Sequence, residues 1–536
     1  MSWIDLHLPI FPVLLPAATA VLMLLLGDHG GNAHGGHGHH KLLWARRLAL
    51  ASTALGLLIA AALVQRAAAG ELISYRLGDW PAPFGIMVLV DRLGAMMLLL
   101  GACVALPVLW YASGGWDAHG RYFHALFQFQ LMGLYGAFVT ADLFNLFVFF
   151  EVLLIASYVL MVHGQGRERF RVGLHYVVLN LAASALFLIG VALIYAKTGT
   201  LNLADLALRV PQVATPDAAV LKVGALLLLV VFGFKAALMP LAMWLPATYA
   251  AASPPVAALF AIMTKVGVYA IVRVHGVVFG DSGGATALTV EPVLLPLALA
   301  TSVVGVMGAL AARTLARLVA WLTVASVGTV LAGLGLYGAA AWGAAFYYML
   351  NSTLVIAALF LLAELVAAQR GDAEGQLVPA SPMAQPTLLG LMMLLAAAST
   401  AGLPPLPGFI GKLMLLESAT GHAWVVGFWA VVLGVGFFTL VGLARAGSIL
   451  FWHVRSDLPA CGDSGSSPKL VLATCALLGA SVLMSVAAAP IQRYTEAAAL
   501  QLMDRAAYAQ AVLGEQGGAA AQTTRPYRID KAKEVR

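Results

Sequence analysis

Four charged residues of this 536-residue chain stand well inside long apolar runs: Glu151, Lys235, Lys265 and Lys412. A charge at the centre of a membrane helix costs roughly 2.5–3.5 kcal/mol. A structural role for all four is therefore a poor explanation, although one or two could be ion pairs that fix the packing. Burial favours the neutral form of a carboxyl or an amine, and an opposite charge nearby favours the charged form. A change in the distance between Glu151 and Lys235 would therefore change how tightly Lys235 holds its proton.

These four residues predict a proton relay through a low-dielectric medium. In this hypothesis Glu151 tunes Lys235, and Lys235 passes its proton through water and Lys265 toward Lys412. Lys412 then hands the proton to the far side.

Other polar residues in the apolar runs are secondary candidates for the same path. Asp142, near the outer end of its run, is equally consistent with an interface residue. Glu364 precedes Arg370 and could extend to the inner surface. His175 is also a candidate, although a histidine in such a run is more often a hydrogen-bonded packing residue.

A glycine-rich segment carries four histidines: His34, His37, His39 and His40. It could hold a transition metal, but a solvated loop is the more frequent interpretation of such a segment. The three cysteines of the chain form no CxxC pair and no spacing suited to an iron–sulfur cluster or zinc. We therefore expect no cofactor.

The composition indicates a membrane protein. Hydrophobic residues make up 61% of the chain and charged residues 10%, against roughly 45–50% and about 25% in an ordinary soluble domain. Apolar segments of around twenty residues, enough to cross a hydrocarbon core of roughly 30 Å as a helix, recur from end to end. The first segment lacks the basic start and cleavage site of a secretory signal, so we expect it to be retained. The net charge of +6 comes without the basic stripe and interleaved aromatic residues of a nucleic-acid surface.

The apolar runs predict an all-α polytopic fold with about fourteen transmembrane helices. Their expected ranges are 8–27, 48–68, 90–111, 121–140, 143–162, 173–196, 222–246, 249–274, 290–311, 318–337, 342–367, 385–420, 423–446 and 469–489. Lys and Arg are more frequent in the loops after odd-numbered helices, which predicts that these loops are cytoplasmic and that the N-terminus lies outside. Arg273, next to the end of the span 249–274, is then counted on the outer side. The tail from Ala497 is expected to form one amphipathic helix on the membrane or on a partner, and its last twenty residues are expected to be disordered.

Two of the predicted spans are interrupted by proline near a lysine. The first interruption runs over 235–246 and the second over 402–412. Proline frees backbone carbonyls that lipid cannot satisfy, so such breaks persist only where protein or a watery cavity surrounds them. A matched pair of broken helices in two halves is a strong sequence indicator of an ion path near the membrane midplane.

The positions of the breaks predict two inverted repeats of five helices, with one broken helix in each. The chain is then divided into helices 1–3 and a first repeat, followed by a second repeat, a last helix and a tail. These parts cover residues 1–120, 121–274, 290–446, 469–489 and 490–536.

Four motifs around the charged residues resemble a known family. They read DLFNLFVFFEVLL at 142–154, FKAALMPLAMWLP at 234–246, TKVGVYA at 264–270 and GLPPLPGFIGK at 402–412. Together they are similar to the D subunit of the Mrp/Pha-type multisubunit monovalent cation/proton antiporters, over about residues 5–490. The resemblance implies a fourteen-helix fold shared with proton-pumping membrane subunits of respiratory complex I and with some membrane-bound hydrogenases.

The resemblance also implies roles for the four charges. The helix-five glutamate and the helix-seven lysine, which drive proton movement in that superfamily, match Glu151 and Lys235. The basic residues of helices eight and twelve match Lys265 and Lys412. Relatives usually carry histidine or lysine in the middle of helix eleven, where this chain has Asn351, which cannot titrate.

This departure from the family pattern leaves two expectations for the second half of the path: it runs through water held by Asn351, Ser352 and Thr353, or it is less efficient in this chain. Antiporters of this type need several other membrane subunits and exchange protons for Na⁺ or K⁺, which the sequence does not distinguish. We expect a multi-pass subunit of a secondary transporter in the bacterial inner membrane, and not an enzyme.

Three alternatives remain open. The nearest is a proton-pumping subunit of complex I or of a hydrogenase-like complex, although the motif at 142–154 favours the antiporter branch. A membrane enzyme acting on lipid or quinone would need clustered histidines and carboxylates at the membrane edge, which the sequence does not offer. A non-transporting scaffold would leave the four buried charges unexplained, and it predicts that neutralising them changes assembly more than transport.

Overall fold

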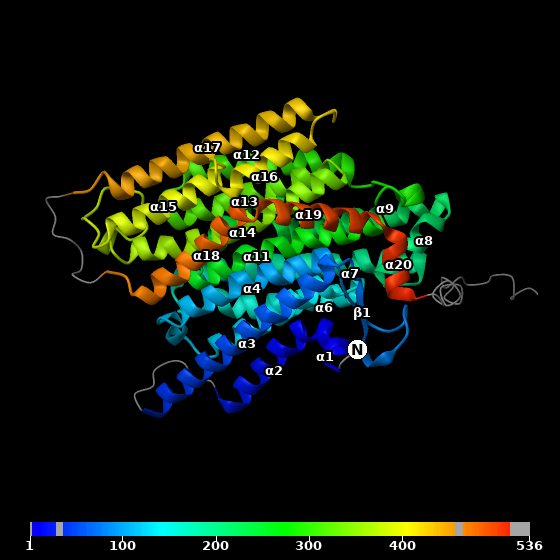
Figure 1. Cartoon of the computed structure of the whole chain (residues 1–536), viewed down its shortest axis with the longest axis horizontal. Coiled ribbons are helices and arrows are strands. Elements are labelled where there is room, and N and C mark those ends of the chain that lie inside the picture. Colours follow the sequence, from blue (N-terminus) through cyan, green and yellow to red (C-terminus); the bar gives the residue numbers. More distant parts are fainter. Residues whose placement is uncertain (1–2, 28–35, 456–464, 515–536) are drawn as a thin grey trace, which may run out of the picture.

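The chain folds into a bundle of long helices that run side by side between two ends (Figure 1). The computed structural model describes residues 3–27, 36–455 and 465–514. The N-terminal part contains α1 (Trp3–His7), α2 (Phe11–Leu26), α3 (Gly36–Ala68), β1 (Ile73–Arg76), β2 (Met87–Val90) and α4 (Arg92–Ala112). The middle part contains α5 (Phe123–Val139), α6 (Leu143–Met161), α7 (Arg167–Thr198), α8 (Leu203–Arg209), α9 (Thr215–Ala236), α10 (Trp244–Ala251), α11 (Pro254–Ile271) and the π-helix η6 (Val272–Val278).

The remaining helices form the second half of the bundle and its C-terminal end. They are α12 (Glu291–Ala311), α13 (Leu315–Gly335), α14 (Ala339–Ala367), α15 (Pro386–Ala401), α16 (Pro407–Ser418), α17 (Val425–Phe451), α18 (Pro468–Val486), α19 (Ala488–Met503) and α20 (Arg505–Leu513). Short 3-10 turns connect several elements: η1 (Leu8–Ile10), η2 (Leu77–Asp79), η3 (Trp116–His119), η4 (Val210–Gln212), η5 (Leu241–Met243), η7 (Gly284–Thr286) and η8 (Gly371–Ala373).

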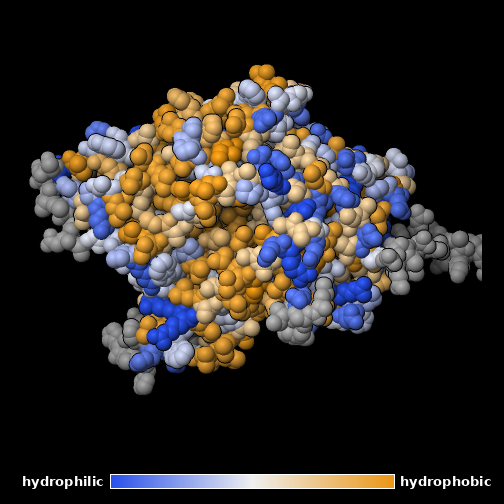
Figure 2. Space-filling model, viewed as in Figure 1, coloured by the Kyte–Doolittle hydropathy of each residue, from blue (hydrophilic) through white to orange (hydrophobic). Residues whose placement is uncertain are grey.

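The predicted all-α polytopic membrane fold is confirmed. Among the described residues, 12 helical segments are long and apolar enough to cross a membrane. The two other predicted spans are α5, which has 17 residues, and the segment 385–420, which is divided into α15 and α16. Hydrophobic side chains cover much of the left and centre of the surface in Figure 2.

Both predicted helix breaks are present. The chain leaves α9 through Ala237, which has a left-handed φ of 65°, and enters α10 after Pro240 and η5. It leaves α15 through Gly402, whose φ of 86° favours glycine, and enters α16 with Pro407 at its first position. A proline lacks the N–H that would continue a helix and is tolerated in the first turn, so the prolines fix where each helix stops and restarts. The inverted relation of the two five-helix units stays a prediction.

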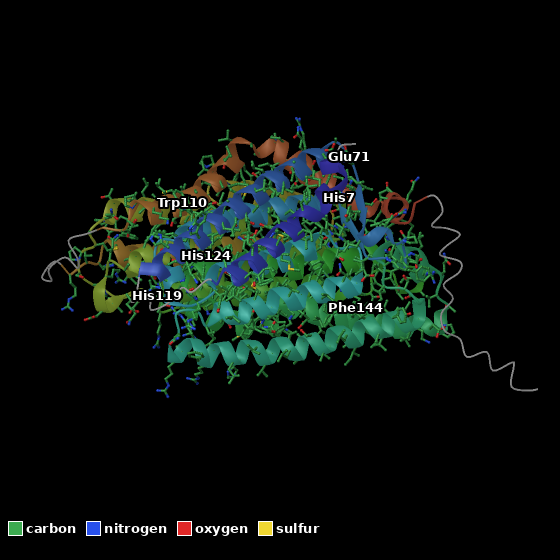
Figure 3. All side chains as sticks on the ribbon, turned by 90° about the horizontal axis from the view of Figure 1, so that it is seen from below. His7, Glu71, Trp110, His119, His124 and Phe144 are labelled. Carbon is green, nitrogen blue, oxygen red and sulfur yellow. The ribbon has the colours of Figure 1, made fainter. Side chains whose placement is uncertain are left out.

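The loops alternate between the two ends of the bundle. In Figure 3, His119 and His124 lie toward one end, whereas His7, Glu71 and Phe144 lie toward the other. We call the end with His119 the inner end and the opposite end the outer end, following the side that the loop charges predict. The short hairpin of β1 and β2, which pair antiparallel from Ile73–Val90 to Arg76–Met87, lies at the outer end.

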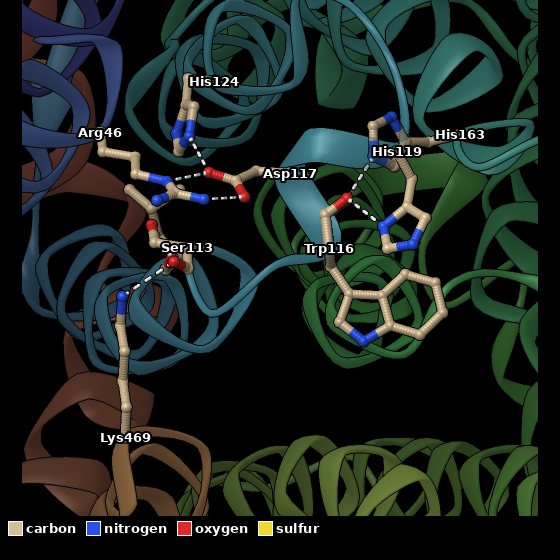
Figure 4. A network of polar contacts seen from close by, with 9 residues as sticks. Arg46, Ser113, Trp116, Asp117, His119, His124, His163 and Lys469 are labelled. Carbon is tan, nitrogen blue, oxygen red and sulfur yellow. Dashed lines mark hydrogen bonds and ion pairs between the residues drawn. The ribbon is translucent and has the colours of Figure 1, made fainter. Parts of the chain in front are cut away.

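A polar network fastens four helices at the inner end (Figure 4). Arg46 donates to Asp117 from Nε at 2.6 Å and from Nη2 at 2.8 Å, and His124 Nε2 is hydrogen-bonded to the same carboxylate at 2.8 Å. Burial alone would raise the pKa of Asp117, but the hydrogen bonds from Arg46 and His124 outweigh burial and hold that pKa at about 2. Lys469 Nζ donates to the Ser113 carbonyl at 2.9 Å. The network therefore ties α3, α4, α5 and α18 together.

The helix that carries Arg273 is longer than the predicted span 249–274, and Arg273 is buried instead of lying at the end of that span. The helix that begins at Pro254 continues as η6 through Val278, so Arg273 lies inside the protein with 2% of its side chain exposed. Its Nη1 and Nη2 donate to the two oxygens of the equally buried Asp91 at 2.7 and 2.9 Å. A bidentate pair of this kind satisfies both buried charges, and it packs η6 against the start of α4.

The C-terminal tail differs from the single amphipathic helix that was expected. It forms two helices, α19 and α20, which are separated at Asp504, and the side chain of Asp504 caps α20 by accepting from the Ala507 N–H at 3.0 Å. α19 packs against α14 and α4, and α20 packs against α8. This part of the tail is therefore integrated into the bundle, whereas the last twenty residues lie outside the described residues.

Candidate functional site

Glu151 and Lys235 are joined through one face of α7. The Ser184 hydroxyl donates a hydrogen bond to Glu151 Oε1, and Lys235 Nζ donates to Asn180 Oδ1 at 2.8 Å. Residues four apart lie on the same face of a helix, so Asn180 and Ser184 present one polar strip between α6 and α9. The carboxylate of Glu151 lies within electrostatic range of the Lys235 ammonium. Among the described residues, no direct ion pair joins the two.

Asn180 itself is held in place. It is buried, and its side-chain amide donates to the Tyr176 carbonyl at 2.7 Å. This bond points Oδ1 at Lys235, because the amide nitrogen is already committed. Lys235, with 7% of its surface exposed, thus has a neutral acceptor in front of it and a carboxylate nearby.

Lys265 lies deeper than the other charges. It is fully buried on α11, and Nζ donates to the Thr264 hydroxyl at 3.3 Å. None of the described hydrogen bonds or ion pairs joins it to Glu151, Lys235 or Lys412. A charged ammonium has three donors to satisfy, of which this hydrogen bond uses one.

Lys412 fills the break between α15 and α16. Its Nζ donates to the Ala401 carbonyl at 2.7 Å and to the Thr400 carbonyl at 3.2 Å. These carbonyls belong to the last turn of α15, where backbone acceptors are left free and the helix dipole attracts a positive charge. The break therefore creates the acceptors that hold the buried ammonium.

A narrow polar cavity connects Lys412 to the middle of α14. Its lining includes Asn351, Ser352, Ser399 and Lys412, and its volume of ≈ 10 Å³ is about the space that one water molecule needs. Asn351 Oδ1 accepts from Ser481 at 2.7 Å and from Ser399 at 3.2 Å. The cavity thus offers a position for a water beside Asn351, as the predicted relay requires. The Thr353 hydroxyl, in contrast, donates to the Met349 carbonyl of its own helix at 2.7 Å.

A larger polar cavity lies at the inner end between α10, α11, α13 and α14. Its volume is ≈ 330 Å³, and its lining includes Glu364 and Arg169. Arg169 Nε donates to the Ala251 carbonyl at 2.9 Å, at the end of α10. Ala257 on α11 also lines this cavity, and Lys265 lies eight residues further along the same helix, a rise of about 12 Å.

The other secondary candidates have different surroundings from the charged four. Asp142 caps α6, since its carboxylate accepts from the Asn145 N–H at 2.8 Å. His175 is exposed on α7, so the packing role expected for it was wrong. In the glycine-rich segment, His34 lies outside the described residues and the side chains of His37 and His39 are also not described.

His40, the last histidine of that segment, is exposed at the start of α3. Within the described ranges, no group of three or more metal-binding side chains is found.

Comparison with known proteins identifies the family. Residues 140–439 match the family described as NADH:quinone oxidoreductase/Mrp antiporter, TM. The chain is 38% identical to the D subunit of a probable K(+)/H(+) antiporter of Rhizobium meliloti, over 96% of this chain and 98% of that protein. It is 35% identical to the D subunit of the Na(+)/H(+) antiporter of Alkalihalophilus pseudofirmus, over 95% and 100%. The chain belongs to the family of Mrp antiporter D subunits. A chain of the Mrp complex from Dietzia sp. has the same fold, with a TM-score of 0.82, 26% identity and coverage of 96% and 100%.

The sequence motifs indicated the four charges but not their hydrogen-bond partners. Asn180 and Ser184 were missed in the sequence, as were Ser399 and Ser481. Their signal is weak, since single polar residues with neutral side chains are common in apolar helices. The spacing of four between Asn180 and Ser184, within the run that precedes the first break, is the one pattern that could have indicated them.

Proposed function

We propose that this chain is the proton-carrying membrane subunit of a multisubunit Na⁺/H⁺ or K⁺/H⁺ antiporter. The observation that carries this proposal is the arrangement of Glu151 and Lys235 around α7. Lys235 donates to a neutral amide, while the carboxylate that could hold its proton is bound by Ser184. A small movement of the lysine from Asn180 toward Glu151 would stabilise its charged form, and the reverse movement would favour proton release.

The proposed path has an entrance and a second half. The polar cavity beside Glu364 has room for water at the inner end, and the fully buried Lys265 lies between that cavity and the outer half of the bundle. In the second half, a water in the cavity at Asn351 would reach Lys412, whose carbonyl partners at the break hold a proton in place. The Ser399 and Ser481 hydroxyls can each accept and donate, so they can relay a proton that Asn351 cannot carry.

The relatives support partners and cargo of the same kind. The two relatives are named as parts of antiporters for K⁺ or Na⁺, and the structural neighbour is part of an Mrp complex. We therefore propose that this chain assembles with other membrane subunits and that cation exchange requires them.

The test is cation-dependent proton exchange in inverted vesicles that carry the complete gene cluster. Lys235→Ala is compared with Lys197→Ala, a lysine outside the path that pairs with Asp217 near the outer end at 2.7 Å. We expect Lys235→Ala to abolish exchange with both Na⁺ and K⁺ while the assembled complex keeps its normal amount, and Lys197→Ala to behave as wild type. Normal exchange by Lys235→Ala, or a loss that matches a loss of assembly, would leave the chain a scaffold.

A further inference from the structure

His275 is a buried titratable residue with no role in the path described so far. It lies in η6 near the outer end with 4% of its surface exposed, and neither ring nitrogen has a hydrogen-bond partner within the described part of the chain. Leaving a buried polar group unsatisfied costs roughly 1–3 kcal/mol, and an imidazole has two such groups. The protein thus buries a side chain that needs partners from outside the chain.

A cavity beside His275 has room for such partners. It lies between η6, the start of α12 and the connection from α13 to α14, and its volume is ≈ 30 Å³. One water needs roughly 10–15 Å³, so about two waters fit. Most of the lining is apolar, and the polar side chains that share it with His275 are Glu291 and Tyr337, both half-buried. Two waters would give each ring nitrogen a partner.

The rim of this cavity is tied to the outer surface. Arg505 Nη2 donates to the Gly276 carbonyl, next to His275, at 3.4 Å, and the same guanidinium lies 3.7 Å from the exposed carboxylate of Asp281. The Tyr337 hydroxyl accepts from the Asp281 N–H at 2.9 Å. Arg273, two residues before His275 on η6, is paired with Asp91 at the start of α4.

The backbone around His275 is also unusual. Val272–Val278 forms a π-helix, a rare conformation that often occurs at functional sites. The π-helix follows α11 directly, so the two form one continuous helical run. This run carries, in order, Ala257 beside the inner cavity, the buried Lys265, and His275 beside the outer cavity. The His275 ring lies 6.3 Å from the ring of Phe232, which precedes Lys235 by three residues, or about 4.5 Å of helix rise.

We propose that His275 and the water in this cavity form an outer proton station, through which the buried lysines exchange protons with the outer surface past Glu291. The imidazole takes up a proton at one ring nitrogen and releases a proton from the other, so one N–H bond forms as another breaks and no other reactant is needed. This inference rests on the proposed function, because it assigns the outer end of the same proton path.

The first test measures cation-dependent proton exchange by the complete complex in inverted vesicles. The single variants His275→Gln and Lys235→Ala are measured in parallel. Glutamine keeps hydrogen bonds to water but does not titrate. Because a positioned proton-transfer group contributes roughly 10²–10⁴-fold, we expect His275→Gln to lower the exchange rate by at least about tenfold with normal assembly. The control is His163→Gln, a histidine with 6% exposure that bonds to the Trp116 carbonyl at the inner end, and it should behave as wild type.

The outcomes separate the two proposals. If His275→Gln exchanges at the wild-type rate while Lys235→Ala shows no exchange, the outer station is overturned and the proposed function stays intact. A wild-type rate for Lys235→Ala overturns both.

A second measurement needs no substitution and therefore does not depend on the folding of a variant. Deuterium exchange at the C2 position of each histidine ring, followed by mass spectrometry of the intact complex, requires water and proton transfer at the ring nitrogens. We expect His275 to exchange at a rate close to that of the exposed His119. Protection of His275 throughout the time in which His119 exchanges fully would mean a dry cavity and would overturn the proposal.

Discussion

Removal of the amide that faces Lys235 should slow proton transfer without unfolding the protein. Asn180→Leu replaces the side chain by an apolar one of similar size, so the ammonium loses its 2.8 Å acceptor. A hydrogen bond to a charged group contributes about 1.5–3 kcal/mol, which corresponds to about 10- to 150-fold in the equilibrium between positions of the lysine. With Asn180 absent, Lys235 is expected to stay charged beside Glu151, and the exchange rate should fall by that factor.

The assay compares exchange in inverted vesicles with the amount of assembled complex. Gln128→Leu is the matched control, because Gln128 is also a fully buried amide and donates to the Thr53 hydroxyl at 3.0 Å, but it lies on α5 away from the path. Gln128→Leu should reduce stability and leave the rate per assembled complex unchanged. Equal rates for Asn180→Leu and wild type, or equal losses in the two variants, would refute the role given to Asn180.

Two further predictions concern stability. Asp117 has a folded-state pKa of about 2, below its ordinary value of 3.8. Its contribution of about 2 kcal/mol to the free energy of unfolding should be complete above about pH 4 and be lost as the pH falls through about 2. The difference in thermal stability between wild type and Asp117→Asn, measured from pH 7 downward, should therefore disappear in that window, and a constant difference would contradict the assignment. Gly408→Ala would press a methyl group against the Ser399 carbonyl beside the second break, so it should lower the free energy of unfolding by about 1–3 kcal/mol. Gly479→Ala on α18 is the control, because its methyl group meets nothing within 4 Å, and it should not lower stability. Equal melting temperatures of the two variants would argue against close packing around Gly408.

Much of the fold follows from features that are local in the sequence. Apolar runs of sufficient length must become helices in lipid because no other structure satisfies the backbone there, and the prolines after Lys235 and before Lys412 set both breaks. The second break also accounts for the carbonyl partners of Lys412, since a helix that ends inside the membrane leaves backbone carbonyls free to accept hydrogen bonds. The four charges could be recognised because lipid makes each of them costly.

Other features depend on how the helices are rotated against one another, which spacing along one chain does not determine. Asn180 meets Lys235 only because α7 turns that face toward α9. The span that carries Arg273 was predicted to end at residue 274 because a charge there is costly in lipid, whereas the burial of Arg273 is compensated by Asp91, which lies 182 residues away in the sequence. His275 lies two residues further on, so the same misplaced boundary hid it.

The central claim is that the charge of Glu151 drives the proton on and off Lys235. The most direct measurement is proton flux through the purified, reconstituted complex with Glu151→Gln, which retains the shape of the side chain and an acceptor for Ser184 but removes the charge. We expect cation-driven proton flux to be lost while the complex assembles and melts as wild type. Wild-type flux with Glu151→Gln would contradict the account, because Lys235 would then release its proton without a carboxylate to control it.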